Sequence, residues 1–230
     1  MRRAWGIAVL ILVPAWMGSA ASSLGLTVGG GYSFDLQSAS LPSVAASSQT
    51  ITTNVPLAAS LVADVGTAAM SVGISGEVLG NQSSTQMVSG TSIPVSSGAT
   101  GQRLYFTASL FGRLPVPLGD LTLLPTLGIE GDFCVYAVDA QGNDLRASMT
   151  PAQIADLNEG WIKAGAALRV PMAGALALEP WILLDYQLPS IGRQNVLANI
   201  TSAGLTPLFL PLRSEAGVTI AFLLSQPSAP

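Results

Sequence analysis

The sequence contains no histidine, one cysteine (Cys134) and one lysine (Lys163). Without histidine, neither a serine–histidine nucleophilic pair nor a histidine metal ligand can form. A single cysteine cannot make a disulfide within the chain, and it lies far from the N-terminus, where a lipid would be attached. We therefore expect no enzymatic activity, no cofactor and no metal site.

Charged residues are also scarce, at 10% of the chain against 49% hydrophobic residues. Soluble domains carry about 25% charged residues, so this depletion is typical of membrane proteins. Beyond the N-terminus, however, the chain lacks an apolar run of about 18 or more residues, which a transmembrane helix would need. A closed β-barrel is the other structure that leaves no backbone group unpaired in lipid. The composition therefore favours strands as the membrane-spanning elements.

The N-terminus has the three parts of a secretory signal peptide. Two arginines follow the first methionine, residues 4–13 are apolar, and small residues follow at 18–21. We predict a signal peptide over residues 1–21, cleaved after Ala20 or Ala21; a retained anchor helix is the alternative, which the short apolar stretch disfavours. Removing the two arginines takes the net charge from −4 to −6, which gives no reason to expect nucleic-acid binding.

The mature part, residues 22–230, alternates between apolar and polar residues with the period of two that is typical of strands. In the first run Leu24, Leu26 and Val28 share one face, while Thr27 shares the other with glycines. Most runs are longer than the roughly 5–6 residues of ordinary strands and suit the roughly 9–11 needed to cross a bilayer. The eight predicted strands are 24–36, 57–66, 69–79, 103–114, 121–137, 161–172, 175–187 and 214–224.

The connections between these runs alternate in length. The long ones, rich in Ser, Thr, Gly, Asn and Gln, are 37–56, 80–102, 138–160 and 188–213. The short ones are 66–68, 115–120 and 171–174. Long loops at one rim and short turns at the other are the arrangement of bacterial outer-membrane barrels. We predict an all-β fold, an eight-stranded antiparallel up-and-down transmembrane β-barrel with four long outer loops, short periplasmic turns and a short tail at 225–230.

The third long connection contains two local signals. Thr150, Pro151 and Gln153 have the spacing of a capping box with proline at the first helical position, which predicts a short helix over 151–158. Residues 139–144 contain acidic and amide side chains that partly resemble a calcium-binding loop. Because that spacing is incomplete, we interpret this segment as a solvated turn.

The charged residues of the predicted strands all have the parity of the polar face. We expect these twelve to form a charge network inside the lumen: Asp35, Asp64, Glu77, Arg103, Arg113, Glu130, Asp132, Lys163, Arg169, Glu179, Asp185 and Glu215. A soluble barrel or sandwich with its apolar face inside is the alternative. Many glycines and a single lysine on the polar face favour a narrow lumen, which an eight-stranded barrel fills with side chains.

Several lumen residues also have a second interpretation. Glu130 with Asp132, and Glu179 with Asp185, could act as acid–base pairs or bind a cation. We favour ion pairing with the basic residues, because buried charges need partners. Trp181 and Tyr136 are predicted to lie in the same lumen, where aromatic rings either fill space or contact a ligand.

The last strand carries a family resemblance. In residues 215–222 a polar residue is followed by Gly217 and then by alternating hydrophobic residues, including Ile220 and Phe222, which resembles the C-terminal insertion signal of outer-membrane proteins. With the eight runs and the loop asymmetry, the mature chain resembles the small OmpA/OmpX/OmpW-like barrels. This resemblance implies export to the cell outer membrane, contact with its lipid, and insertion by the barrel-assembly machinery. The chain departs from such proteins in continuing beyond Phe222.

Two functions remain open at this point. We expect a non-enzymatic outer-membrane protein with a structural or surface-interaction role, whose extracellular loops meet an unidentified surface ligand. The alternative is a narrow channel or small-ligand transport barrel, because the predicted lumen holds eight acidic and four basic residues. Conduction through eight strands is disfavoured, since open porins use about 16–18.

Overall fold

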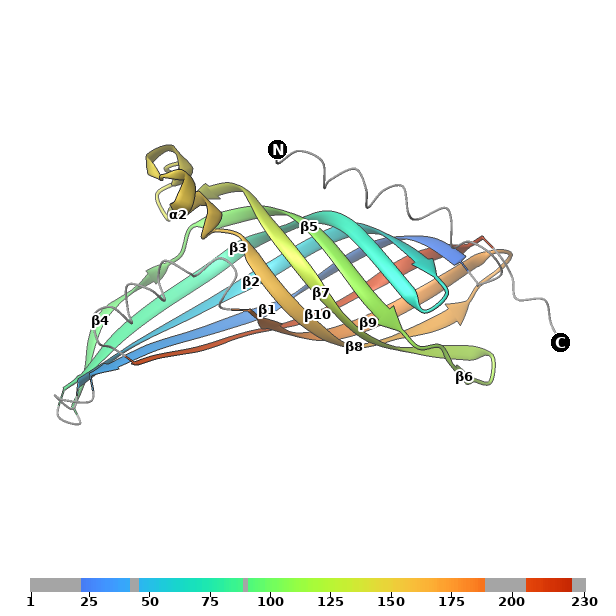
Figure 1. Ribbon diagram of the computed structural model, residues 1–230, viewed down its shortest axis with the longest axis horizontal. Coiled ribbons are helices and arrows are strands. Elements are labelled where there is room, and N and C mark those ends of the chain that lie inside the picture. The colour runs from blue at the N-terminus through green and yellow to red at the C-terminus, as the bar shows by residue number, and fades with distance from the viewer. Residues whose placement is uncertain (1–21, 42–45, 89–90, 189–205, 225–230) are drawn as a thin grey trace, which may run out of the picture.

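The fold is almost entirely antiparallel β-sheet (Figure 1). The computed structural model describes residues 22–41, 46–88, 91–188 and 206–224. The predicted signal peptide with its cleavage site and the predicted tail lie outside these described residues. Within the described part of the chain, no helix is long and apolar enough to cross a membrane.

Ten strands and two short helical segments make up the described chain. The strands are β1 (Ser22–Leu41), β2 (Ala46–Val65), β3 (Ala68–Val88), β4 (Thr91–Ala99), β5 (Gln102–Arg113), β6 (Val116–Leu118), β7 (Leu121–Val138), β8 (Glu159–Pro171), β9 (Leu176–Gln187) and β10 (Thr206–Leu223). The helical segments are η3 (Arg146–Ser148) and α2 (Pro151–Ala155).

Eight of the strands pair in a closed ring, in the order β1–β2–β3–β5–β7–β8–β9–β10 and back to β1. The last strand closes the ring against the first: β10 pairs with β1 from Ser23 opposite Leu223 to Ser40 opposite Thr206. The remaining two strands lie off the ring, because β4 pairs with β3 and β6 pairs with β7. The prediction of an all-β antiparallel fold is therefore confirmed.

Tight turns join the strands at one end of the ring, where the sequence predicts short connections. Gly66 and Gly174 lie in the β2–β3 and β8–β9 turns with φ of 64° and 70°, a left-handed conformation that glycine adopts without steric cost. The third predicted turn is more structured than expected, because β6 occupies part of it and pairs with the start of β7.

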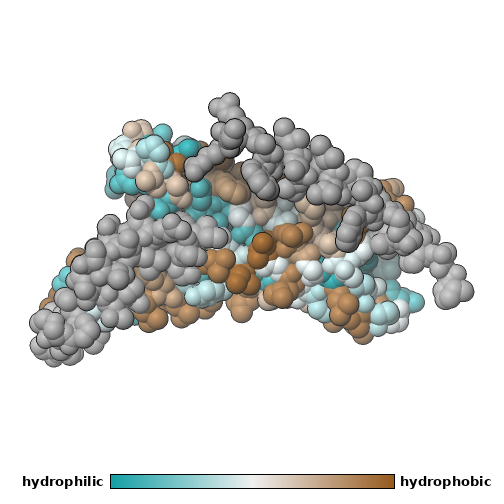
Figure 2. Space-filling view, in the orientation of Figure 1, coloured by the Kyte–Doolittle hydropathy of each residue, from teal (hydrophilic) through white to brown (hydrophobic). Residues whose placement is uncertain are grey.

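Side chains alternate between the interior and the exterior of the ring. On β1, Ser23 and Ser33 are buried whereas Leu24, Leu26 and Val28 are exposed. Figure 2 shows hydrophobic residues across the middle of the face that it presents, and hydrophilic residues near α2. The large apolar residues exposed on the ring strands include Leu57, Leu61, Val72, Ile74, Phe106, Leu110, Leu127, Ile129, Phe133, Ile162, Ile182, Leu184, Ile220 and Phe222. The apolar face of the sheet is therefore the outer face of the ring.

Four strands are longer than the sequence predicts. β1, β2, β3 and β10 contain 20, 20, 21 and 18 residues, and they continue past the ring at the end opposite the tight turns (Figure 1). With β4 they form a sheet extension, which comprises residues 35–41, 46–54, 81–88, 91–99 and 206–211. Much of the predicted loops 37–56 and 80–102, and residues 206–213 of the predicted loop 188–213, are thus strand. These segments lack the apolar alternation that marks a half-buried strand.

A β-bulge corrects the prediction for Tyr136. The β5–β7 register pairs Leu104 with Tyr136 and Tyr105 with Cys134, which leaves Val135 as an extra residue on β7. An extra residue reverses the alternation beyond it. Tyr136 is therefore exposed, not inside as predicted, and Ala137 is buried in its place.

The connection between β7 and β8 folds back over the ring. Thr150 and Gln153 form the predicted capping box, which confirms a short helix here, although α2 ends at Ala155 instead of residue 158. Just after the helix, Leu157 packs with Tyr105 and Cys134 in a buried cluster. This contact fixes the connection to the mouth of the ring.

Candidate functional site

Most of the predicted charged residues meet inside the ring in three groups, stacked from the tight turns towards the sheet extension. The basal cluster comprises Asp64, Arg113, Arg169 and Glu179. The central cluster comprises Glu130, Asp132, Lys163, Asp185, Arg213 and Glu215. The upper cluster comprises Glu77, Arg103, Tyr105 and Glu159. Asp35, the remaining predicted residue, lies beyond the clusters and accepts a hydrogen bond from the Gln37 side chain.

The basal cluster closes the ring near the tight turns. Arg113 lies 3.1 Å from Asp64 and 3.4 Å from Glu179, measured between guanidinium nitrogen and carboxylate oxygen. Arg169 contacts the same two carboxylates at 3.0 Å and 2.5 Å. Two cations thus share two anions. Arg169 is on β8 and Asp64 on β2, which are opposite strands of the ring, so their contact spans the interior.

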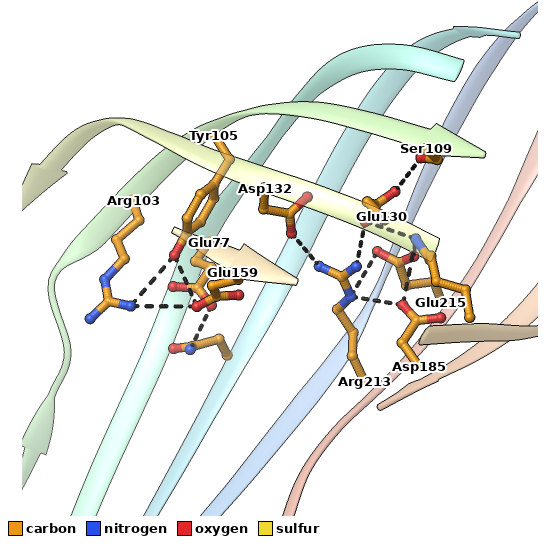
Figure 3. Close-up of polar contacts among 12 residues, drawn as sticks. Glu77, Arg103, Tyr105, Ser109, Glu130, Asp132, Glu159, Asp185, Arg213 and Glu215 are labelled. Carbon is orange, nitrogen blue, oxygen red and sulfur yellow. Dashed lines mark hydrogen bonds and ion pairs between the residues drawn. The ribbon is translucent and has the colours of Figure 1, made fainter. Parts of the chain in front are cut away.

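Arg213 is the centre of the central cluster (Figure 3). Its guanidinium lies 2.6 Å from Glu130, 3.1 Å from Asp132, 2.8 Å from Asp185 and 3.4 Å from Glu215. These carboxylates come from β7, β9 and β10, so one side chain ties three strands of the ring together. Planar guanidinium groups suit such multiple carboxylate contacts because they present five N–H donors in a fixed geometry.

Lys163 is the second cation of the central cluster. Its ammonium lies 3.0 Å from Glu130, 2.6 Å from Glu215 and 3.5 Å from Asp185. The cluster therefore has four carboxylates and two cations. In the described part of the chain, one oxygen each of Asp132 and Asp185 is buried without a hydrogen-bond partner.

Sequence reasoning missed Arg213, which it placed in the loop 188–213. A weak signal was present, because Arg213 has the same parity as Glu215 and Gly217 on the polar face. Prolines at 207 and 211 disfavour a strand on sequence grounds, since proline lacks the N–H that a sheet requires. The structure extends β10 through both prolines and also stacks the Arg213 guanidinium 4.1 Å from the centre of the Trp161 ring.

The upper cluster lies at the mouth of the ring. Tyr105 donates a hydrogen bond to Glu159 at 3.3 Å, and Arg103 lies 3.8 Å from the same carboxylate. Asn54 donates a hydrogen bond of 3.0 Å to Glu77. Glu159 was also missed, because the predicted loop 138–160 ended one residue beyond the true start of β8.

The remaining interior is small and holds the predicted aromatic residue Trp181. A cavity of about 60 Å³ is bordered by Trp181 and by charged residues of the basal and central clusters. A Cβ atom on Gly217 would lie 2.4 Å from the Trp181 ring, and one on Gly29 would lie 2.6 Å from it. These two glycines leave the space that the indole fills, so the aromatic ring serves as filling for the ring interior.

Above the clusters the interior widens into a cavity of about 650 Å³, which we call the vestibule. Its walls come from the sheet extension, from the β7–β8 connection and from the ends of ring strands, among them β3, β5, β8 and β9. Described residues that border it include Asp35, Glu77, Arg103, Asp139, Leu145, Met149, Asp156, Leu157, Glu159, Trp161 and Gln187. It is about ten times larger than the cavity of about 60 Å³ beside Trp181.

The segment 139–144 forms a turn, as the sequence analysis favours. Asp139 accepts hydrogen bonds from the backbone N–H groups of Gln141 and Asn143 and from the Asn143 side chain. The bonds from Asn143 lower the pKa of the Asp139 carboxyl, so Asp139 is ionised at neutral pH. Throughout the described residues, no three His, Cys, Asp or Glu side chains converge as metal ligands do.

The residues of the predicted insertion signal lie on the strand that closes the ring. Ile220 and Phe222 are exposed on the outer face of β10, opposite Leu26 and Leu24 of β1. Gly217 faces the interior beside Trp181. The alternation of this segment therefore places its hydrophobic residues outside.

Comparisons with known proteins found similarity among solved structures and none among protein families or curated proteins. No protein-family profile matches the sequence, and no curated protein matches it. Among solved structures, the chain is similar to the translocator domain of the autotransporter NalP from Neisseria meningitidis. The two chains share 10% sequence identity, the alignment covers 94% of each chain, and the TM-score is 0.24. A likeness this weak carries no argument about function. The resemblance to OmpA/OmpX/OmpW-like barrels stays a prediction.

Proposed function

We propose that the mature chain is a non-enzymatic outer-membrane β-barrel protein that does not conduct ions and that offers its vestibule end as an interaction surface. In this proposal the eight-stranded ring spans the bilayer, and the tight turns face the periplasm. The predicted contacts with lipid and with the barrel-assembly machinery belong to the same proposal.

The observation that carries the proposal is the inverted distribution of side chains. Ile182 is 64% exposed at the middle of β9, while its strand neighbours Glu179 and Asp185 are fully buried at 0%. In water this arrangement is unfavourable, because burying charges and exposing apolar side chains both cost free energy. In lipid the second cost disappears, since the apolar face meets acyl chains, while the enclosed charges are compensated by their ion-pair partners.

The difference between the two ends of the ring supports its proposed orientation in the membrane. The short turns resemble those that face the periplasm in outer-membrane barrels, where the long connections face outward. The sheet extension and the β7–β8 connection both lie at the other end (Figure 1). Exposed Tyr186 on β9 and Tyr32 on β1 lie towards this end of the outer face, as residues of an aromatic girdle do.

The ion-pair clusters favour a closed interior over a channel. Arg169 reaches across the full ring to Asp64, and Arg213 contacts carboxylates on three strands. A conducting path would require these pairs to separate, and a separated buried pair is strongly unfavourable. The excess of acidic residues in the lumen, which suggested transport, instead supplies the carboxylates that link the strands through ion pairs.

The proposal is tested in detergent and in planar bilayers. We expect the purified mature chain to need detergent, and to migrate differently on an SDS gel before and after boiling, because a closed ring of paired strands resists SDS. After insertion into a planar bilayer, the same protein should show no stable conductance steps. A chain that is soluble without detergent would contradict the membrane assignment, and regular conductance steps would support the channel alternative.

A further inference from the structure

We propose that the vestibule binds a small organic cation that carries several amino groups, of the aliphatic polyamine class. This inference rests on the proposed function, because it names a ligand class for the interaction end of the barrel. The ligand would be held by carboxylates around the wall, by one buried amide oxygen at the floor, and by an apolar patch on the side of the β7–β8 connection.

The charge of the vestibule wall is strongly one-sided. Among the described residues that border the cavity, Arg103 is the one that is basic. The described acidic residues that border it are Asp35, Glu77, Asp139, Asp156 and Glu159. Five carboxylates against one guanidinium create a negative potential, which a concave site concentrates. A cationic ligand is therefore favoured over a neutral or anionic one.

The spacing of the carboxylates favours a ligand with spread charges over a metal ion. They come from separate parts of the chain: Asp35 from β1, Glu77 from β3, Glu159 from β8, and the other two from the β7–β8 connection. No three of the described acidic side chains lie close enough to ligate one metal ion. A polyamine, whose charges are separated by methylene groups, can contact carboxylates on opposite walls of a 650 Å³ cavity at the same time.

Gln187 supplies an independent sign of a ligand. Its side chain borders the vestibule at the end of β9 and is 1% exposed, and its Oε1 atom is buried without a hydrogen-bond partner in the described chain. Leaving a buried acceptor unpaired costs about 1–3 kcal/mol, so such groups are normally satisfied. An ammonium group at the vestibule floor would donate the missing hydrogen bond.

Apolar side chains provide the surface for the methylene groups of the ligand. Leu145, Met149 and Leu157 border the vestibule from the β7–β8 connection, and they pack around the buried Tyr105 cluster. Asp139 and Asp156 border the cavity from the same connection, and Asp35, Glu77 and Glu159 border it from the strands. The cavity therefore combines negative charge with hydrocarbon contact, which matches an aliphatic amine better than a fully hydrated inorganic cation.

The experiment is isothermal titration calorimetry of the folded protein in detergent micelles, with spermidine as the probe and boiled-versus-unboiled gel migration as the check of folding. We expect saturable binding of one spermidine per chain at low salt. Glu77→Gln with Glu159→Gln should weaken it by about tenfold or more, because a charge-assisted hydrogen bond contributes about 1.5–3 kcal/mol. Gln187→Leu, which leaves the charge unchanged, should weaken it severalfold. Asp120→Asn, an exposed carboxylate at the far end, is the matched control.

Each contrary result has a distinct meaning. A folded, heat-modifiable protein that does not bind spermidine would overturn the ligand proposal and leave the membrane proposal intact. Equal affinity in the wild type and in both vestibule variants would also overturn it, because binding would then lie elsewhere. Full competition by equimolar Mg²⁺ would overturn the organic-cation assignment in favour of simple ion pairing. A chain that is soluble without detergent would contradict the proposed function, whatever its affinity for spermidine.

Discussion

At the scale of single residues, Arg213 and Arg113 have different importance in the interior, although both form ion pairs with two or more carboxylates. In the basal cluster Asp64 and Glu179 each contact two guanidinium groups, so either arginine can be lost while both anions keep a partner. In the central cluster, Asp132 has Arg213 as its ion-pair partner among the described residues. Removing Arg213 therefore leaves a buried carboxylate without a counter-charge.

We expect Arg213→Ala to lower the free energy of unfolding by about 3–5 kcal/mol, the usual cost of leaving a buried charge unpaired. Arg113→Ala should cost less, about 1–3 kcal/mol, because Arg169 still contacts both of its carboxylates. Urea titration in detergent micelles, followed by the fluorescence of the interior tryptophans, measures both. Equal costs, or a larger cost for Arg113, would contradict the assigned roles of the two clusters.

The residues that sequence reasoning misplaced share a physical cause. Parity along a strand predicts which face a residue occupies only while the strand is regular and its limits are known. Val135 adds one residue to β7 and reverses the parity of Tyr136, and nothing in the local sequence marks that bulge. Glu159 and Arg213 lie just outside predicted strands, so parity was never applied to them. Charged residues in the middle of regular strands, such as Glu130 and Lys163, lie on the polar face that parity assigns to them and contact each other across the ring strands.

At the scale of elements, the strands of the ring could be predicted and those of the sheet extension could not. A ring strand has one apolar and one polar face, so its alternation is visible in the sequence. In the extension both faces carry Ser, Thr, Gln and Asn, as in the hydrogen-bonded pair Thr50 and Ser84. Their stability as strands comes from backbone pairing across β10, β1, β2, β3 and β4, which is a property of neighbours and not of local sequence.

The helix α2 is an element whose start was predictable, because that start is set by side-chain bonds to its own backbone. Thr150 caps the helix, and its hydroxyl accepts a hydrogen bond from the Gln153 N–H. We expect Thr150→Ala to lower the local opening free energy by about 1 kcal/mol, which corresponds to about fivefold faster hydrogen exchange over α2.

Hydrogen exchange followed by mass spectrometry tests this expectation, since it reports α2 and the ring strands separately. The rate of hydrogen exchange in β7 and β8 should be unchanged, because the stability of the ring does not depend on the Thr150 helix cap. Thr67→Ala, in the β2–β3 turn at the other end of the molecule, is the matched control. If Thr150→Ala accelerated exchange throughout the ring, the β7–β8 connection would be part of the ring's folding unit and not a separate cover on the vestibule.

At the scale of the whole molecule, the sealed interior and the apolar exterior follow from one constraint. A closed ring pairs every strand of its sheet, so backbone groups need no help from the solvent. The interior of an eight-stranded ring is narrow, so side chains fill it and its buried charges pair with one another. The exterior carries the apolar side chains that a soluble protein would bury. The proposed site for polar partners is accordingly the vestibule end.

Two exposed isoleucines allow a direct test of whether the apolar outer face of the ring lies in lipid. Ile182 is 64% exposed at the middle of the ring, and Ile93 is 49% exposed on β4 of the sheet extension. In lipid vesicles, Ile182→Arg should cost about 2–4 kcal/mol of unfolding free energy, the depth-dependent cost of arginine at the bilayer midplane. Ile93→Arg should change it by less than about 0.5 kcal/mol, as surface substitutions in water do.

Comparing Ile182→Arg with Ile93→Arg shows whether the ring is surrounded by lipid or by water. Both isoleucines are exposed residues of antiparallel strands, so an aqueous exterior would tolerate arginine at either position, and two small effects would contradict the membrane assignment. Two large effects would mean that the sheet extension also lies in lipid, and would move the vestibule below the membrane surface. A large cost at Ile182 alone places the boundary of the bilayer between the ring and the extension, with the vestibule on the aqueous side.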